Sequence, residues 1–154
     1  MSDWKTKMSE NLQRLRGSVR GGMKGCSEAE ITALGAAWGG TVPAAYAEFL
    51  RVAGRHAGDF LTGSDFDYEY VRTRAAQCAR GLAEEMGITP LPAHAAVFFG
   101  HQDYQFFWFP LGEDPDPPVL RFMSRNQVHS QSAPSFSAWL GAVIDQHLQE
   151  TKRV

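Results

Sequence analysis

The histidines and cysteines are the side chains best suited to hold a metal ion, and their spacing does not support that role. They are His56, His94, His101, His129, His147, Cys26 and Cys78. No two histidines lie three or four residues apart, and the cysteines form no CxxC pair, so the ligand patterns typical of zinc sites are missing. We therefore predict no metal and no cofactor, while a site assembled only by the fold stays open.

A nucleophilic residue would need an activating base beside it, and the sequence offers no such arrangement. Cys78 lies on an apolar stripe, where a thiol usually serves as a small buried side chain. Cys26 precedes a helix start that could favour a thiolate, but a loop cysteine without a role is the more common case. The chain lacks a Gly-x-Ser-x-Gly motif, and its glycine-rich segment 17–25 lacks the Gly-Lys-Ser/Thr ending of a phosphate-binding loop. We predict no catalytic residues and no enzyme.

Two clusters of carboxylates fall in segments that we expect to be loops. Acid/base catalysis would require burial that splits their pKa values, whereas solvated charge is the default state of loop carboxylates. An acidic loop can also steer a basic protein partner toward a binding surface. The candidate partner-binding residues from these clusters are Asp65, Asp67, Glu113, Asp114 and Asp116.

The most informative segment is the aromatic run from Tyr104 to Phe109. Aromatic residues favour strands, and alternate side chains of a strand point to opposite faces, so both faces of this strand carry aromatic rings. One interpretation is a central strand covered on both sides; the other is an aromatic face that is partly exposed for binding. Stacking on nucleic-acid bases is disfavoured because no basic residues surround the run. Tyr104, Phe107 and the nearby His101 complete the candidate partner-binding residues.

The composition is that of an ordinary globular domain. The 154 residues suit one domain, and a chain that is 44% hydrophobic can build a core without disulfides. The formal net charge of -2 leaves no basic footprint, which argues against direct nucleic-acid binding. The N-terminal segment is polar, and no apolar run approaches the roughly 18 residues of a membrane span. We expect a cytoplasmic protein with reduced thiols and no membrane contact.

Helices are predicted wherever apolar residues recur three or four positions apart. The segments with this spacing are 4–19, 27–38, 43–53, 71–86 and 135–148. Ser27 and Glu30 form the Ser-x-x-Glu capping box that is typical of a helix start. Gly39-Gly40 and Gly54 are typical helix ends.

Strands are predicted in the second half of the chain. Short apolar or aromatic runs at 97–99, 104–109 and 119–123 are separated by turn residues, which predicts an antiparallel meander. A weaker strand is expected near Val128. Helices, then a meander, then a closing C-terminal helix indicate an α+β fold in a single domain.

Three stretches of the chain share residues and order with a known family. They read Glu28-x-Glu30-Ile31 to Leu34 followed by Gly39-Gly40 and Val42-Pro43-x-x-Tyr46-x-x-Phe49-Leu50; Val97-Phe98-Phe99-Gly100 followed by Tyr104 to Phe109 and Asp116-Pro117-Pro118-Val119; and Ser135-Phe136-Ser137-x-x-Leu140. The sequence thereby resembles the SUKH superfamily, which includes bacterial immunity proteins and fungal cell-wall assembly regulators. It departs from the pattern at Val42, where leucine is usual, and at Ala53-Gly54-Arg55, which replaces Asn-Gly-Gly.

The resemblance implies a SUKH-like α+β domain at residues 27–150, with residues 1–26 as an N-terminal helix and loop extension. The apolar stripe of this extension could join two chains in a homodimer. For bacterial members the resemblance implies a protein-binding module, here an immunity protein that neutralises a cognate toxin by occluding its active site. Many such toxins are directed at nucleic acids. The alternative is a regulatory scaffold or a small-ligand-binding protein of the same fold.

Overall fold

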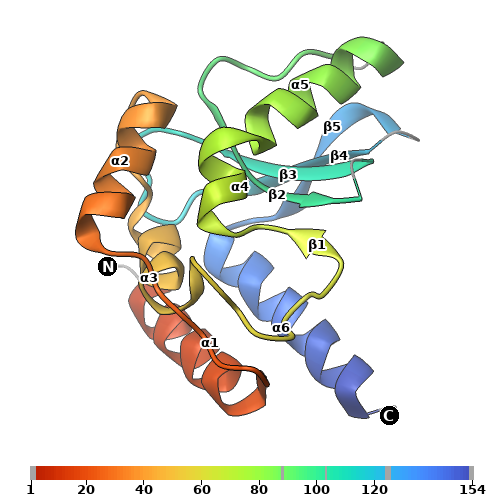
Figure 1. Cartoon of the computed structure of the whole chain (residues 1–154). Coiled ribbons are helices and arrows are strands. Elements are labelled where there is room, and N and C mark those ends of the chain that lie inside the picture. The colour runs from red at the N-terminus through yellow and green to blue at the C-terminus, as the bar shows by residue number, and fades with distance from the viewer. Residues whose placement is uncertain (1–2, 88, 103, 124–125, 153–154) are drawn as a thin grey trace.

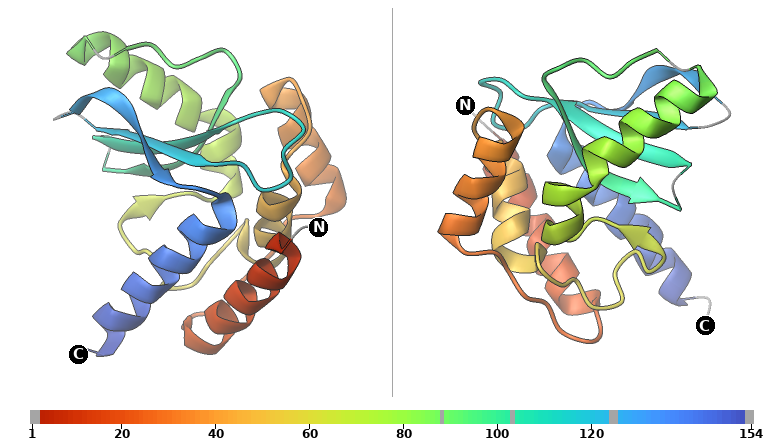
Figure 2. Two further views of the ribbon diagram at one scale, coloured as in Figure 1. Left: turned by 180° about the vertical axis from the view of Figure 1, so that it is seen from behind. Right: turned by 45° about the horizontal axis from the view of Figure 1, so that its top comes forward.

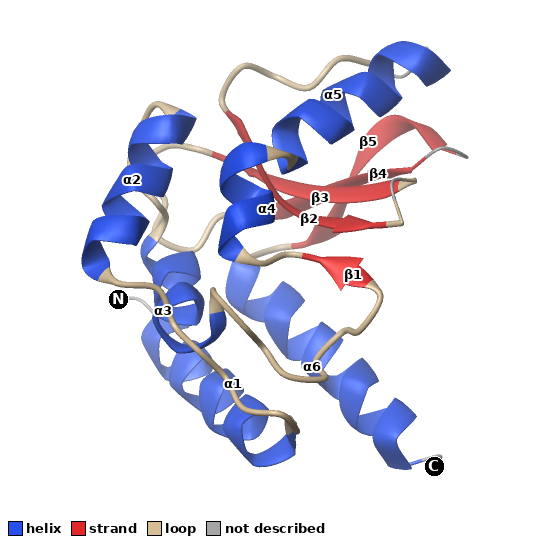
Figure 3. Ribbon diagram, viewed as in Figure 1, coloured by secondary structure: helices blue, strands red, loops and turns tan. Residues whose placement is uncertain are grey.

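The computed structural model describes residues 3–87, 89–102, 104–123 and 126–152, and it has the predicted α+β architecture. The helices are α1 (Trp4–Ser18), α2 (Glu28–Trp38), α3 (Ala44–Ala53), α4 (Tyr68–Thr73), α5 (Ala75–Met86) and α6 (Phe136–Lys152). The strands are β1 (Ser64–Asp65), β2 (Ala95–His101), β3 (Gln105–Pro110), β4 (Val119–Met123) and β5 (Asn126–Ala133). Helices come first, the sheet follows, and α6 closes the chain (Figure 1, Figure 3).

The strands form one antiparallel sheet in the order β1-β2-β3-β4-β5. The predicted meander of β2, β3 and β4 is confirmed, and the weaker strand near Val128 is β5. β1 is missing from the sequence-based prediction because Ser64 and Asp65 show no periodicity of their own. They form a strand only by pairing with His101 and Gly100, which lie far along the chain.

The helix predicted over 71–86 is in fact two helices, α4 and α5. The first begins earlier than predicted because Asp67 caps it, with its carboxylate accepting a hydrogen bond from the backbone N–H of Tyr70 at 3.5 Å. Arg74, with a φ of -129°, lies outside the helical region and separates the two helices. Two short helices can therefore follow the curvature of the sheet that they cover.

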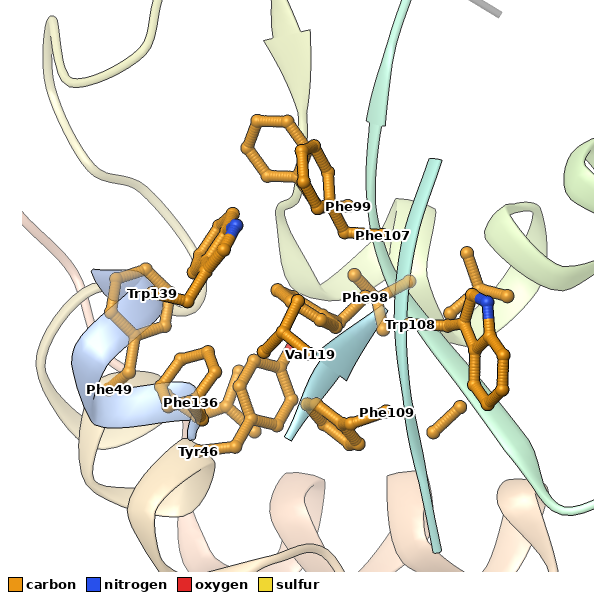
Figure 4. Close-up of a cluster of buried hydrophobic side chains, with 14 of the residues drawn as sticks. Tyr46, Phe49, Phe98, Phe99, Phe107, Trp108, Phe109, Val119, Phe136 and Trp139 are labelled. Atoms are coloured by element: carbon orange, nitrogen blue, oxygen red, sulfur yellow. The ribbon is translucent and has the colours of Figure 1, made fainter. Parts of the chain in front are cut away.

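Helices cover both faces of the sheet (Figure 1, Figure 2). On one face lie α4 and α5, where the Tyr70 side chain lies against Gly100 and Phe106 stacks on Phe122. On the other face lie α6 and α3, whose rings pack on the sheet, and Figure 4 shows Tyr46 and Phe136 gathered against Phe109. The main core lies in this second layer.

The aromatic run is a central strand that is covered on both sides, so the first of its two interpretations is confirmed. Phe106 and Phe109 are fully buried and Phe107 is 9% exposed. Trp108 is also buried and points to the opposite side of β3 from Phe107 and Phe109 (Figure 4). The interpretation of an exposed aromatic strand face is wrong for these residues, because their side chains are buried on both faces of the strand.

α1 packs against α6 and α3 and belongs to the same core as the rest of the chain. Met8, Leu12 and Leu15 are buried there, and the Asn11 side-chain amide donates to the Ser137 carbonyl oxygen at 2.9 Å. The apolar stripe that suggested pairing of two chains is therefore covered within one chain. Trp4 and Val19, at the two ends of the stripe, stay partly exposed.

Candidate partner-binding groove

An open groove of about 670 Å³ lies between one end of the sheet, the loop before β1 and the C-terminal half of α6. Strand register explains which side chains line it. Phe107 lies opposite Phe99 on β2 and opposite Arg121 on β4, so the three side chains share one face of the sheet. That face is the one on which α6 packs, since Phe107 and Phe99 both contact the Trp139 ring. Past Trp139 the helix leaves the sheet uncovered, and the groove opens there.

The rim nearest β1 is formed by His101 and Tyr104. Nδ1 of His101 lies 2.8 Å from the hydroxyl of Ser64, so β1 fixes the imidazole ring. The Tyr104 ring meets the His101 ring edge-on, with 5.5 Å between centroids, and it is 37% exposed. A large aromatic side chain is thus held at the mouth of the groove with its outer face free for contact.

Arg121 lies on the floor of the groove, on β4, the fourth of the five strands. Its Nε atom is buried and has no hydrogen-bond partner, and Arg121 forms no ion pair with any residue that the structure describes. A guanidinium has five donors and no acceptor, so it normally seeks carboxylate or carbonyl oxygens. This cation is available to a molecule that enters the groove.

His147 forms part of the opposite wall, on α6. The residue is 5% exposed, its ring packs edge-on against Phe60, and its Nε2 has no hydrogen-bond partner within the described part of the chain. Buried polar atoms are usually hydrogen-bonded, so this ring nitrogen is a second unsatisfied polar group beside the groove.

The structure brings His101, Tyr104 and Phe107 together in this groove. Asp65 follows Ser64 on the edge strand β1 and is exposed, on the side of the strand opposite to the Ser64 side chain. Asp67 lies at the start of α4, where its carboxylate caps the helix. Of the candidate residues near β1, three therefore line the groove, Asp65 lies on the edge strand, and Asp67 caps a helix.

The other predicted carboxylates lie at the opposite end of β3, in the loop to β4. Both Asp116 carboxylate oxygens accept from Ser137, one from its N–H at 2.8 Å and one from its hydroxyl at 2.6 Å. The Asp114 carboxylate accepts from the Asp116 N–H at 2.9 Å, and Glu113 is exposed. Asp116 and Asp114 thus fix the start of α6, and this end does not join the groove.

Arg121 is not among the site residues predicted from the sequence, and His147 appears there only as a possible metal ligand. His147 carried a signal, since it follows Ile144 by three positions on the apolar side of α6, where a polar residue is unusual. Arg121 carried no such signal, because an arginine in a short strand is common. It becomes a candidate only when the structure shows that no acidic residue lies beside it. That fact depends on the fold.

Among the described residues, neither a cluster of metal-binding side chains nor a side chain with a shifted pKa lies in the groove. No group of three or more His, Cys, Asp or Glu side chains in the described ranges is placed to hold a metal ion. Burial raises the pKa of the Cys26 thiol and of the Tyr46 phenol, and a hydrogen bond from Arg51 lowers the pKa of Glu28. These shifts come from packing and from a surface ion pair, and none of the shifted side chains lines the groove.

Within the described residues, no helix has the length and apolar character that a bilayer crossing requires.

Comparison with known proteins places the chain in a family. A search of curated proteins finds no match. The family model described as SMI1 / KNR4 family (SUKH-1) matches residues 25–142, which is most of the chain and includes the sheet, α2 to α5 and the start of α6. The chain therefore belongs to the SMI1/KNR4 family (SUKH-1), as its resemblance to the SUKH superfamily predicted.

Proposed function

We propose that the protein is a non-catalytic cytoplasmic binding module, an immunity protein that binds a cognate toxin and covers its active site. The groove is the observation that carries the proposal, because it presents an exposed tyrosine and an arginine that has no ion-pair partner among the described residues. Membership of the SUKH family supports the same function, since the resemblance implies immunity for bacterial members.

Tyr104 is the anchor of the proposed interface. Protein interfaces concentrate their binding energy in a few aromatic or arginine side chains near the centre, surrounded by polar contacts. Tyr104 stands at the mouth of the groove, and the exposed carboxylates of Asp65 and Glu150 lie on elements that border it. A toxin directed at nucleic acids would present a basic surface, which these carboxylates would attract.

The first test is a pull-down of the tagged full chain from its native host, followed by mass spectrometry. One stoichiometric toxin-like protein is the expected result. Recovery of no partner, in a host shown to express the neighbouring genes, would contradict the immunity function. It would then favour the alternative, a regulatory or small-ligand-binding protein.

Affinity measurements on the recovered complex then locate the interface. We expect Tyr104→Ala to weaken binding about tenfold or more, because a hot-spot aromatic contributes at least about 1.4 kcal/mol. Asp65→Ala tests the sheet edge, and Glu113→Ala is the matched change at the opposite end of β3. Loss of affinity in Glu113→Ala with none in Tyr104→Ala would move the interface to that opposite end.

A further inference from the structure

We propose that Arg121 binds the carboxylate of an aspartate or glutamate side chain that the protein partner inserts into the groove. This inference rests on the proposed function, which it deepens by naming the chemistry that the partner must bring.

The Arg121 guanidinium has no ion-pair partner among the described residues, whereas several other arginines do. Arg51 and Arg55 each pair with two glutamates, and Arg14 pairs with Asp145. Arg121 pairs with no acidic residue in the described ranges, although its Nε is buried. The two terminal nitrogens are not among the buried unsatisfied atoms, and an incoming carboxylate could accept from both of them at once.

The surroundings of Arg121 would strengthen such a pair. Phe107, directly opposite Arg121 on β3, is almost fully buried and contacts the Trp139 ring at 5.4 Å between centroids. Aromatic walls exclude water and lower the local dielectric constant, so a charge pair formed there is stronger than one on the open surface. The same walls would receive the apolar part of the entering side chain.

His147 lies on the facing wall of the same groove. Its Nε2 is buried without a partner in the described part of the chain, so this nitrogen lies behind the groove surface and does not itself meet an entering group. The Arg121 guanidinium therefore carries the proposed contact.

The other charges of the groove select a carboxylate rather than a polyphosphate. Asp59 and Glu150 are the acidic residues that line it. The Asp59 carboxylate accepts from the Arg20 backbone N–H at 2.7 Å, and Glu150 accepts from the Gln146 amide at 3.3 Å, so neither reaches Arg121. One cation beside two anions would repel a nucleic-acid backbone. It suits a peptide segment with a single acidic side chain flanked by basic residues.

The experiment selects binders from random peptides displayed on phage against the full chain, in parallel for the wild type, Arg121→Gln and Arg80→Gln. Arg80 is an exposed residue of α5, the helix on the opposite face of the sheet, so Arg80→Gln removes the same charge away from the groove. Thermal melting checks that each variant is folded. Arg121→Lys is the second variant, because it keeps the charge but loses the bidentate geometry.

We expect the wild type and Arg80→Gln to enrich peptides that share one Asp or Glu, and Arg121→Gln to bind those peptides about 10- to 100-fold more weakly. In the wild type, adding such a peptide should shift the NMR signal of the Arg121 Nε–H group. Peptides without a shared acidic residue, no enrichment, or acidic peptides that bind Arg121→Gln equally well would each overturn the inference. Binding of a single-stranded DNA oligonucleotide that depends on Arg121 would also overturn it.

The pull-down separates failure of this inference from failure of the proposed function. A toxin that binds the wild type and Arg121→Gln with equal affinity would leave the immunity function standing and refute the role of Arg121. Acidic peptides that depend on Arg121, together with no toxin from the native host, would support the groove chemistry and contradict the immunity function.

Discussion

At the scale of single residues, a carboxylate in a loop can serve the fold or a partner, and Asp116 serves the fold. It holds the N–H and the hydroxyl of Ser137, a buried residue in the first turn of α6. The Pro115 carbonyl beside it accepts from the Ala45 N–H at 2.8 Å, so the same loop is tied to α3 as well. The loop from β3 to β4 therefore joins the sheet to two helices.

We predict that Asp116→Ala lowers the free energy of unfolding by about 1–3 kcal/mol, because the Ser137 donors lose their acceptor in a part-buried site. Urea denaturation measures the change. Glu113→Ala is the control, since Glu113 is exposed on the same loop and its loss should stay within about 0.5 kcal/mol. Equal losses in the two variants would show that the hydrogen bonds to Ser137 contribute no stability.

The buried thiol of Cys26 makes a prediction about pH. Burial raises its pKa, with Arg55 opposing the rise, so the folded state holds the proton more tightly than the unfolded state. The resulting stability is complete below the pKa of the unfolded thiol and is lost as pH rises through the folded pKa. We expect the free energy of unfolding to fall above about pH 8.5, where an unfolded thiol ionises.

Cys26→Ala should flatten this dependence between about pH 8 and pH 9, below the pKa of about 10 at which an unfolded tyrosine is half ionised. Tyr46, whose pKa is also raised by burial, adds its own loss of stability at higher pH. Urea denaturation across this range compares the slopes of the two proteins. Parallel slopes would mean that the Cys26 thiol does not titrate differently in the two states.

Local sequence signals predicted some residue roles and missed others for a physical reason. The capping box of Ser27 and Glu30 is confirmed, with both reciprocal hydrogen bonds present, because its partners lie three residues apart. The hydrogen bonds from Ser137 to the Asp116 carboxylate could not be predicted from the sequence, since two strands separate the two residues along the chain. The sequence also cannot show whether an acidic residue lies beside Arg121, because strand pairing and the position of α6 determine its neighbours.

At the scale of elements, α2, α3 and α6 are predicted nearly to their ends because periodicity and caps are local properties. The helix over 71–86 is wrong in detail, since a helical pattern does not reveal a break at Arg74. The two carboxylate clusters that were predicted to bind one partner lie at opposite ends of the sheet. A meander sends consecutive loops to opposite ends of the sheet, so Asp65 and Glu113 cannot share a small site.

The segment between α1 and α2 passes very close to the backbone of α3 at Gly25. A Cβ added at Gly25 would overlap the backbone carbonyl of Arg51 in α3, and the next residue is held by a 2.7 Å hydrogen bond from the Cys26 N–H to the Leu50 carbonyl. Gly25→Ala should therefore cost more than about 2 kcal/mol of stability, because backbone atoms cannot move aside cheaply.

Gly17→Ala is the matched control for this prediction. A Cβ at Gly17 meets no atom within 4 Å, and the residue lies in the last turn of α1. Alanine there should leave the melting temperature unchanged or raise it. The corresponding gain in the free energy of unfolding is at most about 1 kcal/mol, the difference in helix propensity between glycine and alanine. If Gly25→Ala melted at the temperature of Gly17→Ala, the close packing of this segment on α3 would be incorrect.

At the scale of the whole molecule, the groove depends on how α6 is held. The helix packs on the sheet only at its beginning, and α1 braces its other side through Asn11 and through the ion pair of Arg14 with Asp145. The family match begins at residue 25, so α1 lies outside it. Yet Met8, Leu12 and Leu15 belong to the same buried cluster as the rings on the sheet.

The division into an extension at 1–26 and a domain at 27–150 can therefore be tested by deleting residues 1–26. We predict that the shortened chain melts well below the full chain and binds a hydrophobic dye, because it would expose the faces of α6 and α3 that three buried side chains now cover. Each of these side chains contributes roughly 1.5–3 kcal/mol, a large share of the 5–15 kcal/mol that is typical of a domain. Leu15→Ala in the full chain should cost about 2–5 kcal/mol, whereas Lys5→Ala, at an exposed site, should cost almost nothing. A shortened chain with the melting temperature of the full chain would show that α1 is an independent addition and that the groove is held by the family domain alone.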